Sequence, residues 1–379
     1  MTDASASAAS DVLAGPRPRV GFLGVGWIGR HRMEAMVTGG CVEAVGVADV
    51  DETCIAAAKA LSPGAMVCQT LDHLLEQNLD GLVIATPSAL HAEQAIRALE
   101  QGVAVFCQKP LGRNAAETRA VVDAARRSDR LLGVDMSYRR TRAVEAVRRE
   151  IEAGSLGPIH AVDVVFHNAY GPDKAWFYDP ALSGGGCLMD LGVHLADLVL
   201  WLLKADVVDA DARLFAQGRP VTTETDVEDY AVASIDLSCG TTVRLACSWR
   251  VHAGCDAVIE ASFFGDRGGA RISNRAGSFY DFEARLFHGV SSRRLVEPPD
   301  DWGGRTAADW AARLGRSPRY DPEIEALIRV SALLDRLYAA NRKRAANAAP
   351  HAAGPPAAFE RIDGPTAQSA QPSTGSSTS

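Results

Sequence analysis

Two kinds of hydrophobic pattern divide the chain. In the first third, short runs of apolar residues alternate with stretches of helical periodicity. The apolar runs cover residues 20–23, 42–48, 82–85, 103–107 and 131–134. Runs that are apolar on both faces and separated by helices are typical of a parallel sheet covered on each side. We therefore predict an α/β domain with a doubly wound parallel sheet over residues 19–137.

The pattern changes after about residue 136. A helical stretch over residues 142–153 is followed by short, strand-like segments with turn residues between them. These segments cover residues 159–166, 230–237, 241–249, 257–264 and 269–273. Consecutive strands without intervening helices indicate an antiparallel sheet. Residues 322–341 have the apolar spacing of a final helix, so we predict a second, α+β domain over residues 138–344.

The two ends of the chain differ from both domains in composition. Residues 1–18 and 345–379 are rich in small and polar residues and bury too little apolar surface to fold, so we predict two disordered tails. Over the whole chain, 47% apolar and 23% charged residues are the proportions of an ordinary globular protein. The formal charge is −8 and no stretch is strongly basic, so we expect no nucleic-acid partner.

Neither membrane insertion nor export is expected. The longest clean apolar run, residues 198–203, is far too short to span a bilayer, and the first residues lack a basic flank before an apolar stretch. The eight cysteines show no C-x-x-C spacing, which argues against a zinc ribbon and a dense disulfide framework. We therefore predict a cytoplasmic protein without a bound metal.

A glycine-rich motif directly follows the first predicted strand and opens a helix. It consists of Gly24, Gly26, Trp27, Ile28 and Gly29 in a G-x-G-x-x-G pattern, and Asp49 ends the next strand about 20 residues on. In this setting the three glycines permit a tight turn, close approach to a pyrophosphate and close helix packing. Asp49 would bind an adenosine ribose. Together with Asp51 it would repel a 2′-phosphate, so NAD is favoured over NADP.

A second polar cluster lies on an otherwise apolar helix. Asp190, His194 and Asp197 are spaced to share one helix face, and burial there is unfavourable unless they pair or face a polar cavity. The preceding Gly184–Gly186 would let the backbone approach a ligand. Catalytic use is the favoured interpretation; a satisfied buried polar pair and a metal site are the alternatives.

Lys109 follows the predicted strand 103–107 directly. The carboxyl ends of strands in a doubly wound sheet form the ligand crevice, where a lysine can stabilise a reacting oxygen. Taken alone, Lys109 is better explained as a surface lysine before a loop proline.

In this order, the motifs resemble the family of glucose–fructose oxidoreductases, inositol dehydrogenases and rhizopine-catabolism proteins (Gfo/Idh/MocA). The matching segments are Gly24-x-Gly26-x-x-Gly29, Ala85-Thr86-Pro87-x-x-x-His91, Lys109-Pro110 and Gly184-Gly-Gly186-x-Leu-x-Asp190-x-Gly192-x-His194. The resemblance covers about residues 19–342. It implies a Rossmann domain, a second domain with an open, mainly antiparallel sheet that binds substrate and oligomerises, a nicotinamide cofactor, and homodimers or homotetramers.

The resemblance also implies roles for single residues. Lys109, Asp190 and His194 match the family's catalytic lysine, aspartate and histidine, and Thr86, Pro87 and His91 match a loop beside the cofactor. Gln108, next to the cofactor, stands where the family usually has glutamate, so a negative charge beside Lys109 is missing. The family's Lys-Pro bond is commonly cis.

Further residues are weaker candidates for substrate contact. Arg139, with Arg140 beside it, resembles a basic position that enters the substrate pocket, and Asp197 corresponds to a polyol-contacting position. Trp176 and Tyr178 are placed to stack on a sugar ring. For each of these residues an ordinary surface or core position is the alternative.

These observations predict a nicotinamide-dependent oxidoreductase that transfers hydride to or from a secondary alcohol or ketone of a sugar, inositol or related polyol. His194 would take the hydroxyl proton, Asp190 would support the imidazolium and Lys109 would stabilise the oxyanion. Two other functions stay open: an NAD-using glycosidase of related fold and a non-catalytic dinucleotide sensor.

Overall fold

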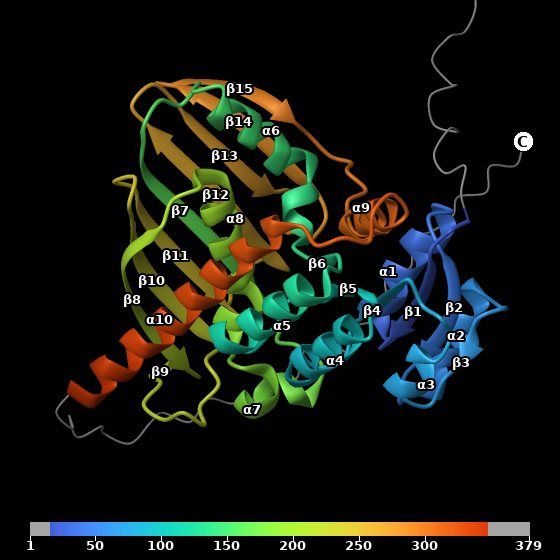
Figure 1. Cartoon of the computed structure of the whole chain (residues 1–379). Coiled ribbons are helices and arrows are strands. Elements are labelled where there is room, and N and C mark those ends of the chain that lie inside the picture. The colour runs from blue at the N-terminus through green and yellow to red at the C-terminus, as the bar shows by residue number, and fades with distance from the viewer. Residues whose placement is uncertain (1–15, 348–379) are drawn as a thin grey trace, which may run out of the picture.

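The computed structural model describes residues 16–347 and builds them around two sheets (Figure 1). Sheet A has six strands in the order β3-β2-β1-β4-β5-β6, and sheet B has nine in the order β15-β14-β13-β12-β7-β11-β10-β8-β9. Sheet A is entirely parallel. Sheet B is antiparallel except where β11 pairs with β7. The predicted fold class is therefore confirmed.

Sheet A and its helices occupy the first part of the chain. The strands are β1 (Arg19–Leu23), β2 (Glu43–Ala48), β3 (Met66–Val67), β4 (Gly81–Ile84), β5 (Ala104–Cys107) and β6 (Leu132–Val134). The helices are α1 (Trp27–Thr38), α2 (Glu52–Leu61), α3 (Leu71–Leu75), α4 (Ser88–Glu100) and α5 (Ala115–Ser128). Every residue of β4 and β5 is buried, because helices cover both faces of the sheet.

A helical region connects the two sheets. Its elements are η1 (Ser137–Arg140), α6 (Arg142–Glu152), η2 (Ala175–Tyr178), α7 (Pro180–Ser183), the π-helical turn η3 (Leu188–Gly192) and α8 (Val193–Leu203). The segment Pro180–Leu203 is long and apolar enough to cross a membrane by length and composition alone, yet 83% of its most apolar window is buried inside the protein. It serves here as a core helix under sheet B.

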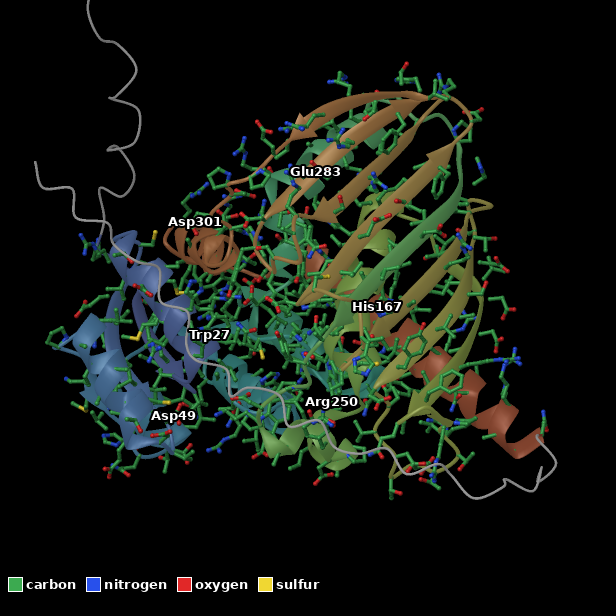
Figure 2. The ribbon with its side chains drawn as sticks, turned by 180° about the vertical axis from the view of Figure 1, so that it is seen from behind. Trp27, Asp49, His167, Arg250, Glu283 and Asp301 are labelled. Atoms are coloured by element: carbon green, nitrogen blue, oxygen red, sulfur yellow. The ribbon has the colours of Figure 1, made fainter. Side chains whose placement is uncertain are left out.

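Sheet B forms the second half. Its strands are β7 (Ile159–Asn168), β8 (Val207–Ala216), β9 (Arg219–Pro220), β10 (Tyr230–Leu237), β11 (Thr242–Ser248), β12 (Ala257–Gly265), β13 (Gly269–Asn274), β14 (Phe282–His288) and β15 (Ser291–Val296). Helices α6 and α8 pack on one face, whereas the face seen from behind carries no helix (Figure 2). The pattern did not predict β8, β14 or β15; in β15 the first four residues, including Arg293 and Arg294, are exposed and show no apolar alternation.

The last two helices tie the halves together. Helix α9 (Arg305–Leu314) packs on sheet A, where Trp310 lies 5.6 Å from Phe106 between ring centroids. Helix α10 (Ala326–Asn347) contacts both α5 and β8. It begins four residues later than predicted, because Pro322–Glu325 form the 3-10 turn η4, which Asp321 caps. The predicted tails, 1–18 and 345–379, lie almost entirely outside the described residues.

Candidate active site

The glycine-rich motif lies between β1 and α1, and its three glycines have different surroundings. Gly24 has φ +81°, and a Cβ there would lie 2.6 Å from the Ala85 carbonyl carbon. A Cβ on Gly29 would lie 2.0 Å from the Gly24 oxygen. A Cβ on Gly26 would meet nothing within 4 Å. Gly24 therefore permits the turn, and Gly29 permits the close packing of α1. Gly26 leaves free space beside the backbone at the start of α1, and a pyrophosphate needs such space.

Trp27 and Asp49, which flank this loop, are both visible on the same side of the molecule (Figure 2). Trp27 is 59% exposed and stacks on His31, while Ile28 is half-buried. The Asp49 carboxylate accepts hydrogen bonds from the Val25 amide at 2.6 Å and the Asp51 amide at 3.0 Å. Asp49 is thus held at the rim of the loop, at the end of β2, where the ribose of a dinucleotide would lie.

A buried histidine joins the loops that follow β4 and β5. His91 is 1% exposed, and its ring nitrogens lie 2.7 Å from the carbonyl oxygens of Pro110 and Thr86. Burial lowers the pKa of His91. Pro87 directly precedes α4, and the Lys109–Pro110 peptide bond is cis, as the resemblance implies. The bridge through His91 fixes the lysine loop against the loop beside the dinucleotide site.

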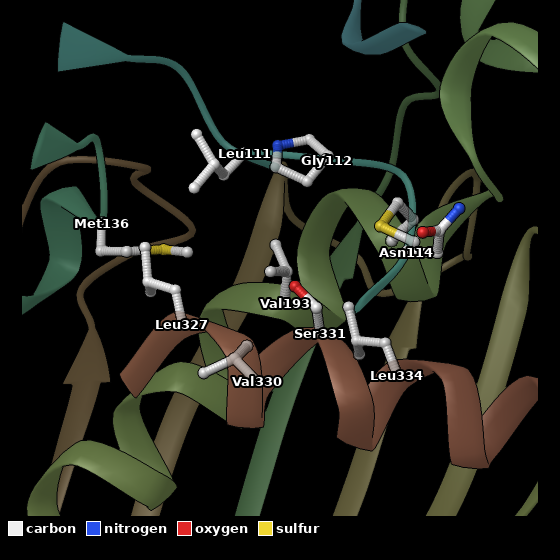
Figure 3. A pocket seen from close by; sticks show the side chains of 11 residues that line it. Leu111, Gly112, Asn114, Met136, Val193, Leu327, Val330, Ser331 and Leu334 are labelled. Carbon is white, nitrogen blue, oxygen red and sulfur yellow. The ribbon is translucent and has the colours of Figure 1, made fainter. Parts of the chain in front are cut away.

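The same lysine loop packs on the other side against α10. Figure 3 shows Leu111, Met136, Leu327 and Val330 facing one another across a cavity of about 10 Å³. A cavity of that size barely holds one water, so it is a packing gap and not a ligand site. The catalytic candidate Lys109 therefore extends from a loop that is anchored on both sides.

A salt bridge across the two halves joins Lys109 to Asp190. The Lys109 ammonium donates to Asp190 Oδ1 at 2.6 Å and to the Asp190 carbonyl at 2.7 Å. The Trp249 indole donates to Asp190 Oδ2 at 3.1 Å. The side chains of Lys109 and Asp190 are 19% and 16% exposed, so the pair is shielded but not fully buried.

His194 lies beside this pair in an aromatic environment. It is 9% exposed, and its ring lies edge-on to Tyr138 with 4.9 Å between centroids. The pKa of His194 is well below its usual value because of burial, to which the positive charges of Lys109 and Arg32 add. A neutral imidazole near a lysine is a suitable proton acceptor.

The expected hydrogen-bonded pair of Asp190 and His194 is not formed. Both Asp190 oxygens are taken by Lys109 and Trp249, and no hydrogen bond between Asp190 and His194 is present in the part of the chain that the structure describes. The reason is local: residues 188–192 form a π-helical turn, which changes the angular spacing that an α-helix would give. Asp190 therefore turns toward the lysine and away from the imidazole.

Gln108 belongs to a buried polar network that includes neither Lys109 nor Asp190. Its amide donates to Asp135 Oδ2 at 2.7 Å, and the same oxygen accepts from Arg32 Nε at 2.5 Å. Ser137 also donates to Asp135. A glutamate at position 108 would place a second carboxylate against Asp135, so the glutamine fits this network whereas the residue usual in the family would not.

Each glycine of the second segment lies close to another part of the protein, although Gly184 and Gly185 also line a cavity of about 880 Å³. A Cβ would clash with Arg113 at Gly184, with the Tyr338 hydroxyl at Gly185 and with the Glu228 carbonyl at Gly186. The Glu228 carboxylate is 1% exposed and accepts from the amides of Gly186 and Leu188 and from Tyr338. The glycines therefore allow the backbone at the start of η3 to pack closely against Glu228.

The weaker candidates for substrate contact interact with other side chains of the same chain. The Arg139 guanidinium makes a two-point ion pair with Asp197, which is 2% exposed. Arg140 pairs with Asp309 at 3.0 Å. Trp176 stacks on Phe177. Substrate contact by these side chains stays a prediction.

Sequence reasoning missed three site residues: Tyr138, Trp249 and Glu228. Trp249 directly follows β11, and an aromatic residue just after a strand end is the signal that could have drawn attention to it, whereas Tyr138 lies in η1 and has no such signal. Tyr178, 37% exposed, lies edge-on to Trp249 at 5.7 Å and so extends the aromatic wall beside Asp190. Glu228 lies in a loop, and no pattern around it distinguishes it.

Two family models match the chain over most of its described length. The model described as "Oxidoreductase family, NAD-binding Rossmann fold" (GFO_IDH_MocA) matches residues 18–136. The model described as "GFO/IDH/MocA C-terminal domain" (GFO_IDH_MocA_C3) matches residues 144–271. The two matches fall on sheet A and on most of sheet B.

Curated relatives cover different shares of the chain. A levoglucosan dehydrogenase of Pseudarthrobacter phenanthrenivorans is 35% identical over 143 residues, which are 36% of this chain and 37% of that protein. A putative UDP-kanosamine synthase oxidoreductase subunit of Amycolatopsis mediterranei is 31% identical over 258 residues, 64% of this chain and 71% of that protein. The chain thus spans less than two thirds of the first of these relatives and more than two thirds of the second.

Solved structures share the fold. GenD2 from gentamicin A biosynthesis, in complex with NAD, is 24% identical with a TM-score of 0.72, over 86% of this chain and 95% of that one. KijD10, a 3-ketoreductase from Actinomadura kijaniata in complex with NADP, is 20% identical with a TM-score of 0.73, over 86% of this chain and 98% of that one. At these identities the likeness concerns architecture alone.

Proposed function

The chain belongs to the Gfo/Idh/MocA family of oxidoreductases with an NAD-binding Rossmann domain, and from this premise we propose that it oxidises or reduces a CH–OH group of a sugar, inositol or related polyol. One observation carries the proposal: Lys109 from the first half and Asp190 from the second meet at 2.6 Å, with His194 close enough for the lysine charge to lower its pKa. Relatives named as sugar dehydrogenases support the substrate class.

The residues present fit a dinucleotide. Gly26 leaves free space at the start of α1, and Trp27 and Asp49 flank it. A bound nicotinamide supplies the hydride acceptor or donor. Asp49 and Asp51 would place negative charge at the ribose, so the enzyme uses NAD in preference to NADP. Titration with NADH and NADPH tests this preference, and equal affinities would contradict it.

The chain's own residues handle the proton and the developing charge. His194, neutral near pH 7 because burial lowers its pKa, accepts the hydroxyl proton of the substrate. The Lys109 ammonium hydrogen-bonds the substrate oxygen as it becomes negative. Asp190 keeps Lys109 in place through its carboxylate and its carbonyl, and Trp249 keeps the carboxylate in place. Asp190 therefore acts on the lysine, a role different from the one expected from spacing.

The enzyme associates into homodimers or homotetramers through the outer face of sheet B. This face carries no helix in Figure 2, and it exposes apolar side chains, with Val232 39% and Phe264 43% exposed. An uncovered sheet face that exposes apolar side chains among polar ones can serve as a site of association. Light scattering on the wild type and on Phe264→Lys tests it: the variant should be smaller, and a monomeric wild type would contradict the proposal.

The proposed activity is tested by following NADH absorbance with a panel of sugars, inositols and their keto forms. Lys109→Met and His194→Asn should each lower kcat by about 100-fold or more, the size of a lost oxyanion donor or general base. Lys174→Met, at a lysine that is 68% exposed, is the matched control and should keep full activity. Full activity of both site variants with NADH still bound would reject the roles.

The same assays separate the other two functions. Release of sugar from a chromogenic glycoside without net NADH would identify a glycosidase. Tight NADH binding without turnover of any substrate in the panel would identify a sensor.

A further inference from the structure

A buried polar network surrounds Asp135, the residue that directly follows β6. Asp135 is 1% exposed, and Arg32, Gln108 and Ser137 around it are also buried. Its Oδ2 accepts hydrogen bonds from Gln108 Nε2 at 2.7 Å and from Arg32 Nε at 2.5 Å, and its Oδ1 accepts one from the Ser137 hydroxyl. Arg32 also donates to Ser137 Oγ at 3.2 Å. Both carboxylate oxygens are therefore bonded, and three separate segments of the chain meet at Asp135.

Stability alone does not explain an ion pair at this depth. Taking two charges out of water costs several kcal/mol per ion, and replacing a buried pair by apolar residues is often neutral or stabilising. A fully bonded polar network does, however, hold its members in one arrangement. We therefore ask what the three segments carry.

The first segment carries the proposed catalytic lysine. Gln108 directly precedes Lys109, and the Gln108 amide donates to the Ile84 carbonyl at 2.8 Å. The Asp135 amide donates to the Cys107 carbonyl at 3.0 Å. Together with the side-chain bond between Gln108 and Asp135, these contacts fix the backbone from which Lys109 extends against β4 and against the end of β6.

The second segment carries the ring that packs on the proposed catalytic histidine. Ser137 directly precedes Tyr138, and the Tyr138 ring lies edge-on to His194 with 4.9 Å between the ring centroids. The third segment is α1, which begins at the glycine-rich loop and carries Arg32. In the part of the chain that the structure describes, no hydrogen bond joins a side chain of the network to Lys109 or His194. An effect of the network on catalysis would therefore pass through the neighbouring residues.

We propose that Asp135 is a positioning residue of the proposed hydride transfer. Through Gln108 it fixes the backbone that carries Lys109. Through Ser137 it fixes the ring against which His194 packs. A displacement of about 1 Å in a catalytic group can cost about 100-fold in rate, so Asp135 affects kcat without touching the substrate. This inference rests on the proposed function, because the two catalytic residues are those assigned there.

An exchange of charge within the network tests the role of Asp135. Gln108→Glu places a second carboxylate against Asp135, so the two side chains repel each other and Lys109 is displaced. We expect kcat to fall by about tenfold or more, while KM for the sugar and the affinity for NADH stay within about twofold. The double variant Gln108→Glu/Asp135→Asn again has one carboxylate and one amide at this place, and it should recover kcat to within about threefold of the wild type.

Crystal structures of the wild type and both variants give a readout that does not depend on activity. Lys109 Nζ lies 2.6 Å from Asp190 Oδ1, and this distance should exceed about 3.5 Å in Gln108→Glu and return in the double variant. A wild type that turns over no substrate of the panel would reject the proposed function. The distance would still decide whether Asp135 positions the lysine.

Ser137→Ala is the milder variant if Gln108→Glu does not fold. It removes one hydroxyl that donates to Asp135 and should lower kcat by about three- to tenfold at unchanged NADH affinity. Ser155→Ala is the matched control, because it removes a hydroxyl that donates to Glu150 at 2.6 Å outside the active site, and it should keep full activity.

Four results would overturn the role of Asp135. They are wild-type kcat in Gln108→Glu, wild-type kcat in Ser137→Ala, a loss that appears in KM alone, and a double variant no more active than Gln108→Glu.

Discussion

Two glycine-rich segments of this chain look alike in sequence and differ in what surrounds them. In the first, Gly26 has no atom within 4 Å of the position of a Cβ. In the second, a Cβ on Gly186 would lie 1.9 Å from the Glu228 carbonyl oxygen. Gly26 leaves room for a ligand, whereas Gly186 leaves room for the Glu228 backbone. A cluster of glycines therefore indicates that another group approaches the backbone closely. It does not tell whether that group belongs to a ligand or to the protein itself.

The largest effect is expected at the second segment. Gly186→Ala forces a methyl group against the Glu228 backbone, which has no flexible end to move aside, and should lower the free energy of unfolding by about 3 kcal/mol or more. Urea denaturation measures it. An unchanged midpoint would show that the segment is free to shift, and the comparison between the two segments would then fail.

The reverse is expected at the first segment. Gly26→Ala meets no protein atom, so its free energy of unfolding should stay within about 0.5 kcal/mol of the wild type. Because the new methyl group occupies the space of the pyrophosphate, NADH affinity should fall by about tenfold or more, or about 1.4 kcal/mol.

Fluorescence titration with NADH measures this change. Gly64→Ala is the matched control, since a Cβ there also meets nothing within 4 Å, and it should bind NADH as the wild type does. Normal NADH affinity of Gly26→Ala would mean that the cofactor does not pass over this glycine.

An effect on stability smaller than that of Gly186→Ala is expected where Glu228 is held. Tyr338→Phe removes a hydroxyl that donates to Glu228 at 2.8 Å inside the protein. The amides of Gly186 and Leu188 remain bonded to the carboxylate, so the loss should be about 1.5–3 kcal/mol, the range for a hydrogen bond to a charged group. Thermal unfolding measures it, and NADH affinity should not change. A change in NADH affinity alone would place Tyr338 in the cofactor site instead.

The smallest effect concerns a buried histidine from each half. His91 and His194 both have a lowered pKa because of burial, so below about pH 6.5 the unfolded chain binds protons that the folded chain does not. Each histidine should therefore reduce the free energy of unfolding by up to about 1.4 kcal/mol per pH unit as the pH falls below 6.5. The stability they provide is fully present above that pH.

Urea denaturation at pH 7.5 and pH 5.5 measures this dependence in the wild type, His91→Asn and His194→Asn. Each variant should depend less on pH than the wild type. An equal pH dependence in all three proteins would show that neither histidine is kept neutral by the fold.

Much of the architecture was determined by local sequence. The apolar runs at residues 82–85 and 103–107 predicted β4 and β5, because central strands of a parallel sheet are buried on both faces and must be apolar throughout. The turn at Gly24 and its link to α1 followed from spacing alone. Edge strands such as β15 could not be found in this way, because exposed residues carry no periodic pattern.

Only the tertiary structure decided which side chains meet. Sequence spacing paired Asp190 with His194, but the π-helical turn directs Asp190 to Lys109, 81 positions earlier in the chain. Likewise, Glu228 and Tyr338 lie 110 positions apart and are joined by packing. Local sequence sets the periodicity of an element and therefore its buried face, whereas a contact between distant residues depends on how whole elements pack, which no local pattern encodes.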